Sequence, residues 1–178
     1  RRSKRSKQTN TPRQTHAGHG EPLKVAMTHT TTQDFDVLIV GSGLAGLTAA
    51  LQLAPTHRVA VITKRQLQDG SSGWAQGGIA AVLAEDDSFD AHVQDTLTAG
   101  AGLCDLASTR YVVENAPDTI AWLQQLGVPF SQEDGCLHLT REGGHSARRI
   151  VHATDATGAA VQQTLIAHVR QMPNITLL

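Results

Sequence analysis

Residues 34–55, DFDVLIVGSGLAGLTAALQLAP, change their hydrophobic pattern in the middle. Val37–Val40 form a short, continuous apolar run, which is typical of a strand buried on both faces. Residues 44–54 instead place leucine and alanine on one stripe of a helix, and Pro55 ends that helix. A second apolar run, over residues 57–63, follows a minimal turn. This strand–helix–strand order predicts a right-handed crossover within a parallel sheet, and therefore an α/β fold.

Three glycines between the strand and the helix have the spacing that dinucleotide binding requires. Gly41 permits a tight turn, Gly43 lets a pyrophosphate approach the backbone, and Gly46 lets the helix pack on the strand. The first N–H groups of the helix then face the anion. The alternative is an ordinary structural turn. We predict a dinucleotide site at the whole fingerprint, Gly41-Ser42-Gly43-Leu44-Ala45-Gly46.

The acidic residue that usually binds the ribose hydroxyls is missing from its expected place about 20 positions further on. The chain has Ile62-Thr63-Lys64-Arg65 there instead. One interpretation of this basic pair is a contact with the 2′-phosphate of NADP. The other is that backbone groups and Lys64 contact the adenosine end of a different dinucleotide.

A second glycine-rich stretch, SSGWAQGGIAA, covers residues 71–81. Its serines, Ser71 and Ser72, and the pair Gly77-Gly78 would bring main-chain donors close to a flat or anionic ligand. Gln76 offers both a donor and an acceptor to the edge of a heterocycle. A flexible loop is the alternative interpretation.

The first 33 residues differ in composition from the rest. Seven of the 15 basic residues fall in the first 24 positions, and the segment has no hydrophobic periodicity. We therefore expect a disordered basic tail over residues 1–33. The chain does not begin with Met, so we expect translation to start at Met27 and residues 1–26 to lie outside the natural protein. A nucleic-acid-binding arm and a targeting peptide are the alternatives for this tail.

The length and composition of the whole chain predict one soluble domain. The 178 residues are 40% hydrophobic and 17% charged, which allows a single core. No run approaches the roughly 18 apolar residues of a membrane helix. Cys104 and Cys136 are far apart, as in a protein of a reducing compartment. Histidines recur at His138, His145 and His152, but glycines interrupt any helix that would align them, so we expect no metal site.

The rest of the chain predicts further helices and one strand. Pro117 should begin a new helix that ends before Gly127, and Thr157 should cap a helix through His168. Residues 131–152 are polar and irregular, as in a loop that lines a site. The other predicted elements are helices over residues 90–98 and 106–115, an extended segment at 128–130 and a strand at 174–178.

Several spans together resemble the N-terminal part of the L-aspartate oxidase family, in the flavoprotein group of succinate dehydrogenase and fumarate reductase. They are VLIVGSGLAGL, SSGWAQGGIAA, DTLTAGAGLCD and HLTREGGHSARRIVHATDATG. The match runs from about residue 35 to residue 178, and TREGGHS followed by RR is its most specific part. The resemblance implies a Rossmann-like FAD-binding domain with a parallel sheet. Residues 34–178 would be its incomplete N-terminal part, ending before the capping domain of the longer family enzymes.

The resemblance also implies the cofactor and the residues that hold it. In the respiratory relatives a histidine before the paired glycines tethers FAD, but this chain has Ser71 there, so we expect noncovalent FAD. Fingerprint and resemblance together predict these cofactor-binding residues: Gly41, Ser42, Gly43, Leu44, Ala45, Gly46, Lys64, Ser71, Ser72, Gly73, Trp74, Ala75, Gln76, Gly77 and Gly78.

The implied activity is oxidation of L-aspartate to iminoaspartate, the first step of de novo NAD synthesis. Oxygen, giving hydrogen peroxide, or fumarate would reoxidise the flavin. Glu142 corresponds to the family glutamate that orients the substrate; its alternative role is a surface ion pair with Arg141 or Arg148. Arg148 and Arg149 have either carboxylates or phosphate as partners. In the family, the principal proton-transfer arginine belongs to regions beyond Leu178. We therefore expect that residues 1–178 alone do not catalyse the reaction.

The resemblance also extends to partners and location. Hand-over of the product to quinolinate synthase in the cytoplasm would follow, with no nucleic-acid or membrane partner. A fumarate reductase or succinate dehydrogenase flavoprotein is the alternative enzyme. A non-catalytic nucleotide-binding fragment is the alternative of another class.

Overall fold

The computed structural model describes residues 32–153 and 156–178. The chain divides into two units, Arg1–Gln33 and Asp34–Leu178, and the fold below is that of the second unit. The predicted tail and the proposed start at Met27 therefore lie almost wholly outside the described residues.

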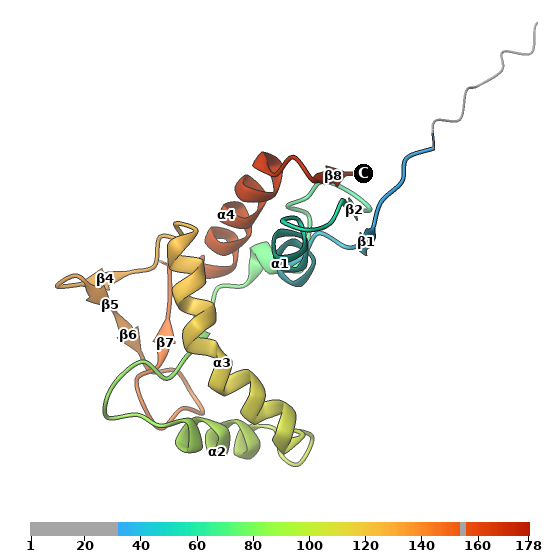
Figure 1. Ribbon diagram of the computed structural model, residues 1–178. Helices are drawn as coiled ribbons and strands as arrows, with labels where there is room; N and C mark the ends of the chain where they lie inside the picture. The colour runs from blue at the N-terminus through green and yellow to red at the C-terminus, as the bar shows by residue number, and fades with distance from the viewer. Residues whose placement is uncertain (1–31, 154–155) are drawn as a thin grey trace, which may run out of the picture. The chain divides into compact units, whose positions relative to one another are not determined.

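A parallel sheet of three strands confirms the predicted α/β fold. Its order is β1 (Val37–Val40), β2 (Val59–Ile62) and β8 (Ile175–Leu177), as Figure 1 shows. Helix α1 (Leu44–Leu53) is the crossover between β1 and β2. The second predicted strand is confirmed as β2, whose first three residues are buried. The prediction that residues 37–40 are buried on both faces is wrong for β1, whose side chains on one face are exposed because no described residue covers them.

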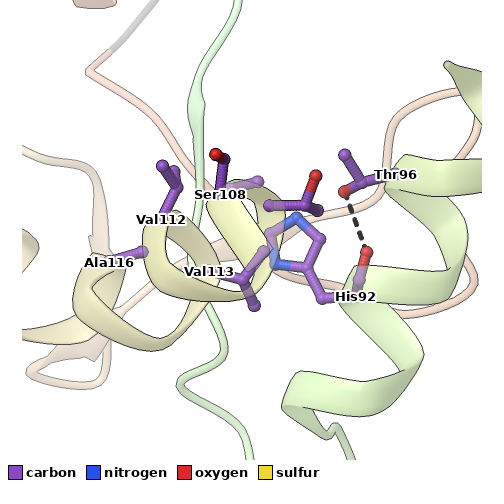
Figure 2. Close-up of a pocket in the computed structure, with 8 residues that line it drawn as sticks. His92, Thr96, Ser108, Val112, Val113 and Ala116 are labelled. Carbon is purple, nitrogen blue, oxygen red and sulfur yellow. Dashed lines mark hydrogen bonds between the residues drawn. The ribbon is translucent and has the colours of Figure 1, made fainter. Parts of the chain in front are cut away.

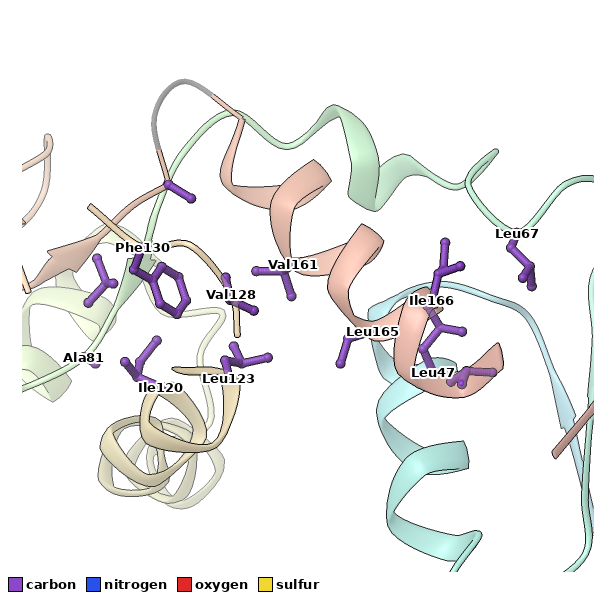
Figure 3. Packing of buried hydrophobic residues seen from close by; sticks show 13 residues of the cluster. Leu47, Leu67, Ala81, Ile120, Leu123, Val128, Phe130, Val161, Leu165 and Ile166 are labelled. Atoms are coloured by element: carbon purple, nitrogen blue, oxygen red, sulfur yellow. The ribbon is translucent and has the colours of Figure 1, made fainter. Parts of the chain in front are cut away.

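The core lies between α1 and α4 (Thr157–Gln171) and continues toward α3 (Leu106–Gln125). Figure 3 shows Leu165 and Ile166 of α4 close to Leu47 of α1, with Val161 on the side of Val128. Burial of these side chains holds the fingerprint helix α1 against α4.

Helices α2 (Phe89–Ala99) and α3 begin at side-chain caps. Ser88 accepts a hydrogen bond from the N–H of Ala91 at 3.2 Å, and Asp105 accepts one from Ser108 at 2.8 Å. Such caps satisfy N–H groups that have no partner within the helix.

The prediction of a new helix at Pro117 is wrong, because α3 runs unbroken from Leu106 to Gln125 with the proline inside it. Val113 and Ile120 are buried on either side of the proline. Tertiary packing of this apolar face therefore outweighs the local preference for a break.

The prediction that residues 131–152 are irregular is wrong in part, because they include four short antiparallel strands, while residues 141–149 form a loop without regular structure. The turn at Asp134-Gly135 has φ of +51° and +81°, the conformation that an Asp-Gly hairpin favours. The Asp-Gly dipeptide was a signal in the sequence from which this hairpin could have been predicted. The strands are β4 (Gln132–Glu133), β5 (Cys136–Leu137), β6 (Leu139–Thr140) and β7 (Ile150–Val151), and β3 (Ile79–Ala80) pairs with β7.

The predicted cap at Thr157 is also wrong. Thr157 is the first helical residue of α4, and the N-cap is Ala156, which makes no side-chain cap. The buried Thr157 hydroxyl instead accepts a hydrogen bond from the N–H of Ala153 at 3.1 Å. In the part of the chain that the structure describes, no helix is long and apolar enough to cross a membrane.

Candidate functional site

A cavity of about 460 Å³ lies where the fingerprint meets the loop after β2 and the second glycine-rich stretch. It brings together three segments that are separate in sequence, as the dinucleotide prediction requires. Its lining residues are Gly41, Ser42, Gly43, Thr63, Lys64, Arg65, Gln66, Asp69, Gly70, Ser71 and Ser72.

Each glycine of the fingerprint has a different structural role. Gly41 has φ of +114°, which side chains rarely adopt, and its N–H donates to Ile62 at 2.8 Å. A Cβ at Gly46 would overlap the carbonyl oxygen of Gly41, so the third glycine permits the close packing that was predicted. Gly43 is the N-cap of α1 and provides no side-chain cap. The start of α1 therefore borders the cavity with main-chain donors available to an anion.

Ser42 is buried, and its hydroxyl is engaged within the protein. Its Oγ lies 3.0 Å from the hydroxyl of Thr63 and 3.2 Å from the carbonyl oxygen of Leu67, to which it donates. The Ser42 side chain therefore fixes the turn beneath the cavity. Thr63, which sequence reasoning did not select, shares this task.

Residues 71–74 of the second glycine-rich stretch divide between two cavities. Ser71 and Ser72 border the fingerprint cavity, in the short 3-10 helix η1 (Ser71–Trp74), and Ser72 Oγ lies 3.5 Å from the backbone nitrogen of Leu44. Gly73 and the exposed Trp74 line a separate cavity of about 260 Å³ against α4. Leu44 lines a third cavity, of about 890 Å³.

At two glycines of this stretch, neighbouring protein atoms occupy the space that a Cβ would need. A Cβ at Gly73 would lie 2.6 Å from Oε1 of Gln162, and one at Gly78 would overlap the carbonyl of Val151. Packing of the protein is thus sufficient reason for both glycines. Ala75, Gln76 and Gly77 are exposed.

Two residues of α4 that sequence reasoning missed hold η1 and the loop before it in place. Gly158 donates its N–H to the carbonyl of Ala75 at 3.0 Å, and a Cβ on it would overlap the carbonyls of Ser72 and Ala75. Gln162 is 2% exposed and donates to Leu67 at 3.3 Å. A glycine in the first turn of a helix was the available signal, because glycine is a poor helix former.

Glu142 lies beside the second glycine-rich stretch, far from it in sequence. A Cβ at Gly77 would be 3.8 Å from Oε2 of Glu142. Within the described residues, Glu142 forms no ion pair with Arg141 or Arg148. Arg148 donates from Nε to the carbonyl of Leu139 at 2.9 Å. The carboxylate therefore stays available to a cationic group near Gly77.

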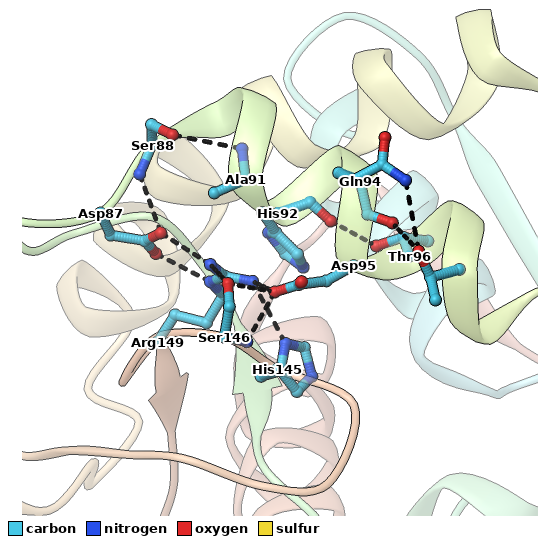
Figure 4. Close-up of polar contacts among 11 residues, drawn as sticks. Asp87, Ser88, Ala91, His92, Gln94, Asp95, Thr96, His145, Ser146 and Arg149 are labelled. Atoms are coloured by element: carbon cyan, nitrogen blue, oxygen red, sulfur yellow. Dashed lines mark hydrogen bonds and ion pairs between the residues drawn. The ribbon is translucent and has the colours of Figure 1, made fainter.

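Arg149 is fully buried, and its partners are carboxylates. Its guanidinium contacts both oxygens of Asp87, at 2.8 and 2.6 Å, and Oδ2 of Asp95 at 2.6 Å, as Figure 4 shows. The backbone N–H and the hydroxyl of Ser146 also donate to Asp95, each at 2.7 Å. The alternative that the sequence left open, a phosphate partner for Arg149, does not hold in this structure.

These contacts shift the ionisation of the cluster. Hydrogen bonds from Arg149 hold the pKa of Asp87 below its ordinary value. Burial raises the pKa of Asp95, but Ser146 and Arg149 outweigh it and hold that pKa at about 2. Burial, assisted by the charges of Arg149 and His145, lowers the pKa of His92. The cluster is therefore ionised at neutral pH on its arginine and both aspartates.

A cavity of about 430 Å³ lies apart from the predicted cofactor residues, between α2 and α3 (Figure 2). His92 borders it, and its carbonyl accepts a hydrogen bond from Thr96 at 2.9 Å. The described residues contain no group of three His, Cys, Asp or Glu side chains arranged for a metal, and both cysteines are free thiols.

Comparison with known proteins agrees with these features. The family described as "FAD binding domain" matches residues 36–178. L-aspartate oxidase 1 of Ralstonia nicotianae is 63% identical over 148 residues, which are 82% of this chain and 28% of the relative. L-aspartate oxidase of Pseudomonas aeruginosa is 53% identical over 151 residues, 80% of this chain and 28% of the relative. The chain thus spans a little over a quarter of the relatives' length.

Solved structures show the same fold. Quinol fumarate reductase FrdA of E. coli matches with a TM-score of 0.77 and 35% identity, over 80% of this chain and 25% of that one. Sdh1 of Mycobacterium smegmatis matches with a TM-score of 0.75 and 28% identity, over 81% and 27%. The resemblance to L-aspartate oxidases within this flavoprotein group is therefore confirmed.

The residues present fit the cofactor that this family binds. The cavity beside α1 has an uncapped helix start, a glycine turn at Gly41 and the side chain of Lys64, which suit the pyrophosphate and nucleotide of FAD. With the match covering residues 36–178, the chain belongs to the FAD binding domain family, and its cofactor is FAD.

Proposed function

We propose that the complete gene product oxidises L-aspartate to iminoaspartate. The observation that carries this proposal is the carboxylate of Glu142, which lies beside Gly77 without an ion-pair partner in the described part of the chain. An amine is the substrate group that such a carboxylate recognises. The higher identity to L-aspartate oxidases than to the fumarate reductase supports the same choice.

The chain's own residues would bind and orient. The fingerprint and Lys64 would hold FAD, which supplies an acceptor for the two electrons that leave the substrate. Glu142 would bind the ammonium group of L-aspartate and favour it over succinate, which has no amine. The resemblance assigns proton transfer to an arginine beyond Leu178.

The remaining expectations belong to the same proposal. Oxygen or fumarate would reoxidise the cofactor, and the product would pass to quinolinate synthase in NAD synthesis. We place the activity in the cytoplasm, which the two free thiols, Cys104 and Cys136, support.

We propose noncovalent binding of FAD because Ser71 stands where the respiratory relatives attach it. The exposed Ser71 offers a hydroxyl, which is a poorer nucleophile than an imidazole. Acid precipitation of the complete gene product should release the yellow flavin into the supernatant. Flavin that stays in the protein pellet would contradict this.

Anaerobic reduction of the bound flavin tests the activity directly. L-aspartate should bleach the flavin absorbance of the complete gene product, and succinate at the same concentration should not. Bleaching by succinate alone would identify a succinate-oxidising flavoprotein instead. A protein that binds FAD and is reduced by neither compound would support the non-catalytic alternative.

A further inference from the structure

The loop that carries Glu142 has little packing of its own. It covers residues 141–149 between β6 and β7, and every side chain before Arg149 is exposed or half-buried. Gly143 and Gly144 have open space around them, and Gly144 has φ of +84°. A segment with so few buried contacts samples many conformations unless another group fixes it. Presenting a carboxylate at one place beside Gly77 therefore requires an anchor.

Arg149 forms that anchor at the end of the loop. Its side chain is 0% exposed, and its two carboxylate partners are Asp87, just before the N-cap of α2, and Asp95, within α2. The planar guanidinium spans Asp87 and Asp95 at the same time, which the single ammonium of a lysine cannot reproduce. Figure 4 shows the guanidinium between the two carboxylates.

Asp95 adds a second attachment closer to Glu142. Its Oδ2 accepts from the N–H of Ser146, from the hydroxyl of Ser146 and from Arg149, at 2.7, 2.7 and 2.6 Å. One carboxylate oxygen thus holds the loop at two points. We call Asp87, Asp95, Ser146 and Arg149 the loop clamp.

We propose that the loop clamp positions Glu142 against Gly77 and so sets the preference of the site for a substrate amine. Its members act through the loop and are positioning residues. The inference rests on the proposed function in one respect, because it takes Glu142 as the group that binds the ammonium.

Trypsin digestion tests the clamp without reference to activity. Arg141 and Arg148 are exposed cleavage sites in the loop. In the FAD-bound complete gene product, Asp95→Asn should raise the cleavage rate at these sites by about 10-fold or more, since the open population of the loop grows. Asp90→Asn is the matched control, because Asp90 lies on the same helix in an exposed pair with Arg110. Equal cleavage rates for the two variants would overturn the clamp.

Substrate binding tests the positioning of Glu142. With Asp95→Asn, the KM for L-aspartate should rise about 10-fold while kcat and FAD content change little, as expected when a binding interaction is misplaced. The dissociation constant of succinate, measured from its perturbation of the flavin spectrum, should stay the same. A purely structural clamp would weaken both compounds alike, and that result would overturn the proposal.

A double substitution separates this inference from the proposed function. Glu142→Gln alone should raise the KM for L-aspartate, and adding Asp95→Asn should cause little further increase, because both act through one carboxylate. If the double variant instead raises the KM by the product of the two separate increases, the positioning role of the loop clamp is overturned, while the proposed function is not. No effect of Glu142→Gln on L-aspartate would overturn the assigned role of Glu142 and with it this inference, while the trypsin result still decides whether the loop is clamped.

Arginine replacements give a second, charge-preserving comparison. Arg149→Lys should reproduce the effect of Asp95→Asn on KM, because lysine loses the fork that spans two carboxylates. Arg148→Lys, in the same loop, should leave KM within about twofold, since Arg148 is exposed and contacts one carbonyl. A larger increase in KM for Arg148→Lys than for Arg149→Lys would overturn the proposal.

Discussion

At the scale of single residues, Ser42 and Gly46 have different roles in the fingerprint turn. The hydroxyl of Ser42 is used inside the protein, on Thr63 and Leu67, while the absence of a side chain at Gly46 lets α1 reach the turn. The sequence spacing correctly predicted the tight turn at Gly41 and the close packing at Gly46, because both roles are local. It did not distinguish a serine that contacts a ligand from one that fixes a turn, because that depends on residues far along the chain.

Gly46→Ala should destabilise the complete gene product by about 1–3 kcal/mol and reduce its FAD content, since the added Cβ meets the carbonyl of Gly41. Thermal unfolding and the ratio of flavin to protein absorbance measure the two effects. Gly143→Ala is the control, because a Cβ there has open space and should change neither quantity. A Gly46→Ala protein with full flavin content and unchanged melting would contradict the packing role.

Stability should fall as the pH drops from about 5 toward about 2. The pKa of Asp95 is about 2 in the folded protein, and that of an unfolded aspartate is about 3.9. The unfolded chain therefore takes up the proton first, so the stabilisation is complete above the unfolded pKa and disappears as pH falls through the folded one. Asp87 shifts in the same direction.

Melting temperatures of the complete gene product across this range measure the effect. Asp95→Asn should melt lower than the parent at neutral pH, and the difference should shrink in acid. A constant difference at every pH would contradict the assigned pKa.

At the scale of elements, α3 shows why local rules gave the wrong helix boundary. Proline favours a helix start, and the sequence around Pro117 predicted two helices. The structure has one, with Val113 and Ile120 buried on either side of the proline. Burial of that face depends on partners that no local pattern contains. The hairpin at Asp134-Gly135 is the opposite case, since its local signal was present and sufficient.

Pro117→Ala should raise the stability of the complete gene product, by up to about 3 kcal/mol, because it restores a helix N–H and removes a ring from the helix interior. Ala121→Pro, on the same helix, should lower stability by a similar amount or more. Thermal unfolding compares both variants with the parent. A lower melting temperature for Pro117→Ala would show that the ring is needed for packing.

At the scale of the whole molecule, β1 pairs only with β2 among the described residues, and its side chains Leu38 and Val40 are 58% and 81% exposed. An apolar strand at the edge of a sheet is a template for association. The apolar run at residues 37–40 is suited to burial on both faces, and the described residues leave one of its faces bare.

Residues 34–178 produced alone should therefore associate through β1. Val40→Lys should reduce this association, because a charge at the strand opposes edge-to-edge pairing. Leu103→Lys is the control, since Leu103 is equally apolar and 94% exposed but lies outside the sheet. Light scattering of the three proteins measures the effect, and an equal reduction by both substitutions would contradict a role for the edge of β1.

The sequence by itself determined the order of strand, glycine turn and helix, the parallel sheet and the dinucleotide fingerprint, because these depend on hydrophobic period and backbone freedom over a few consecutive residues. Only the tertiary structure decided that Arg149 pairs with Asp87 and Asp95, and that Glu142 lies beside Gly77. Those contacts join segments that are distant in sequence, and their partners are chosen by how the chain packs in three dimensions.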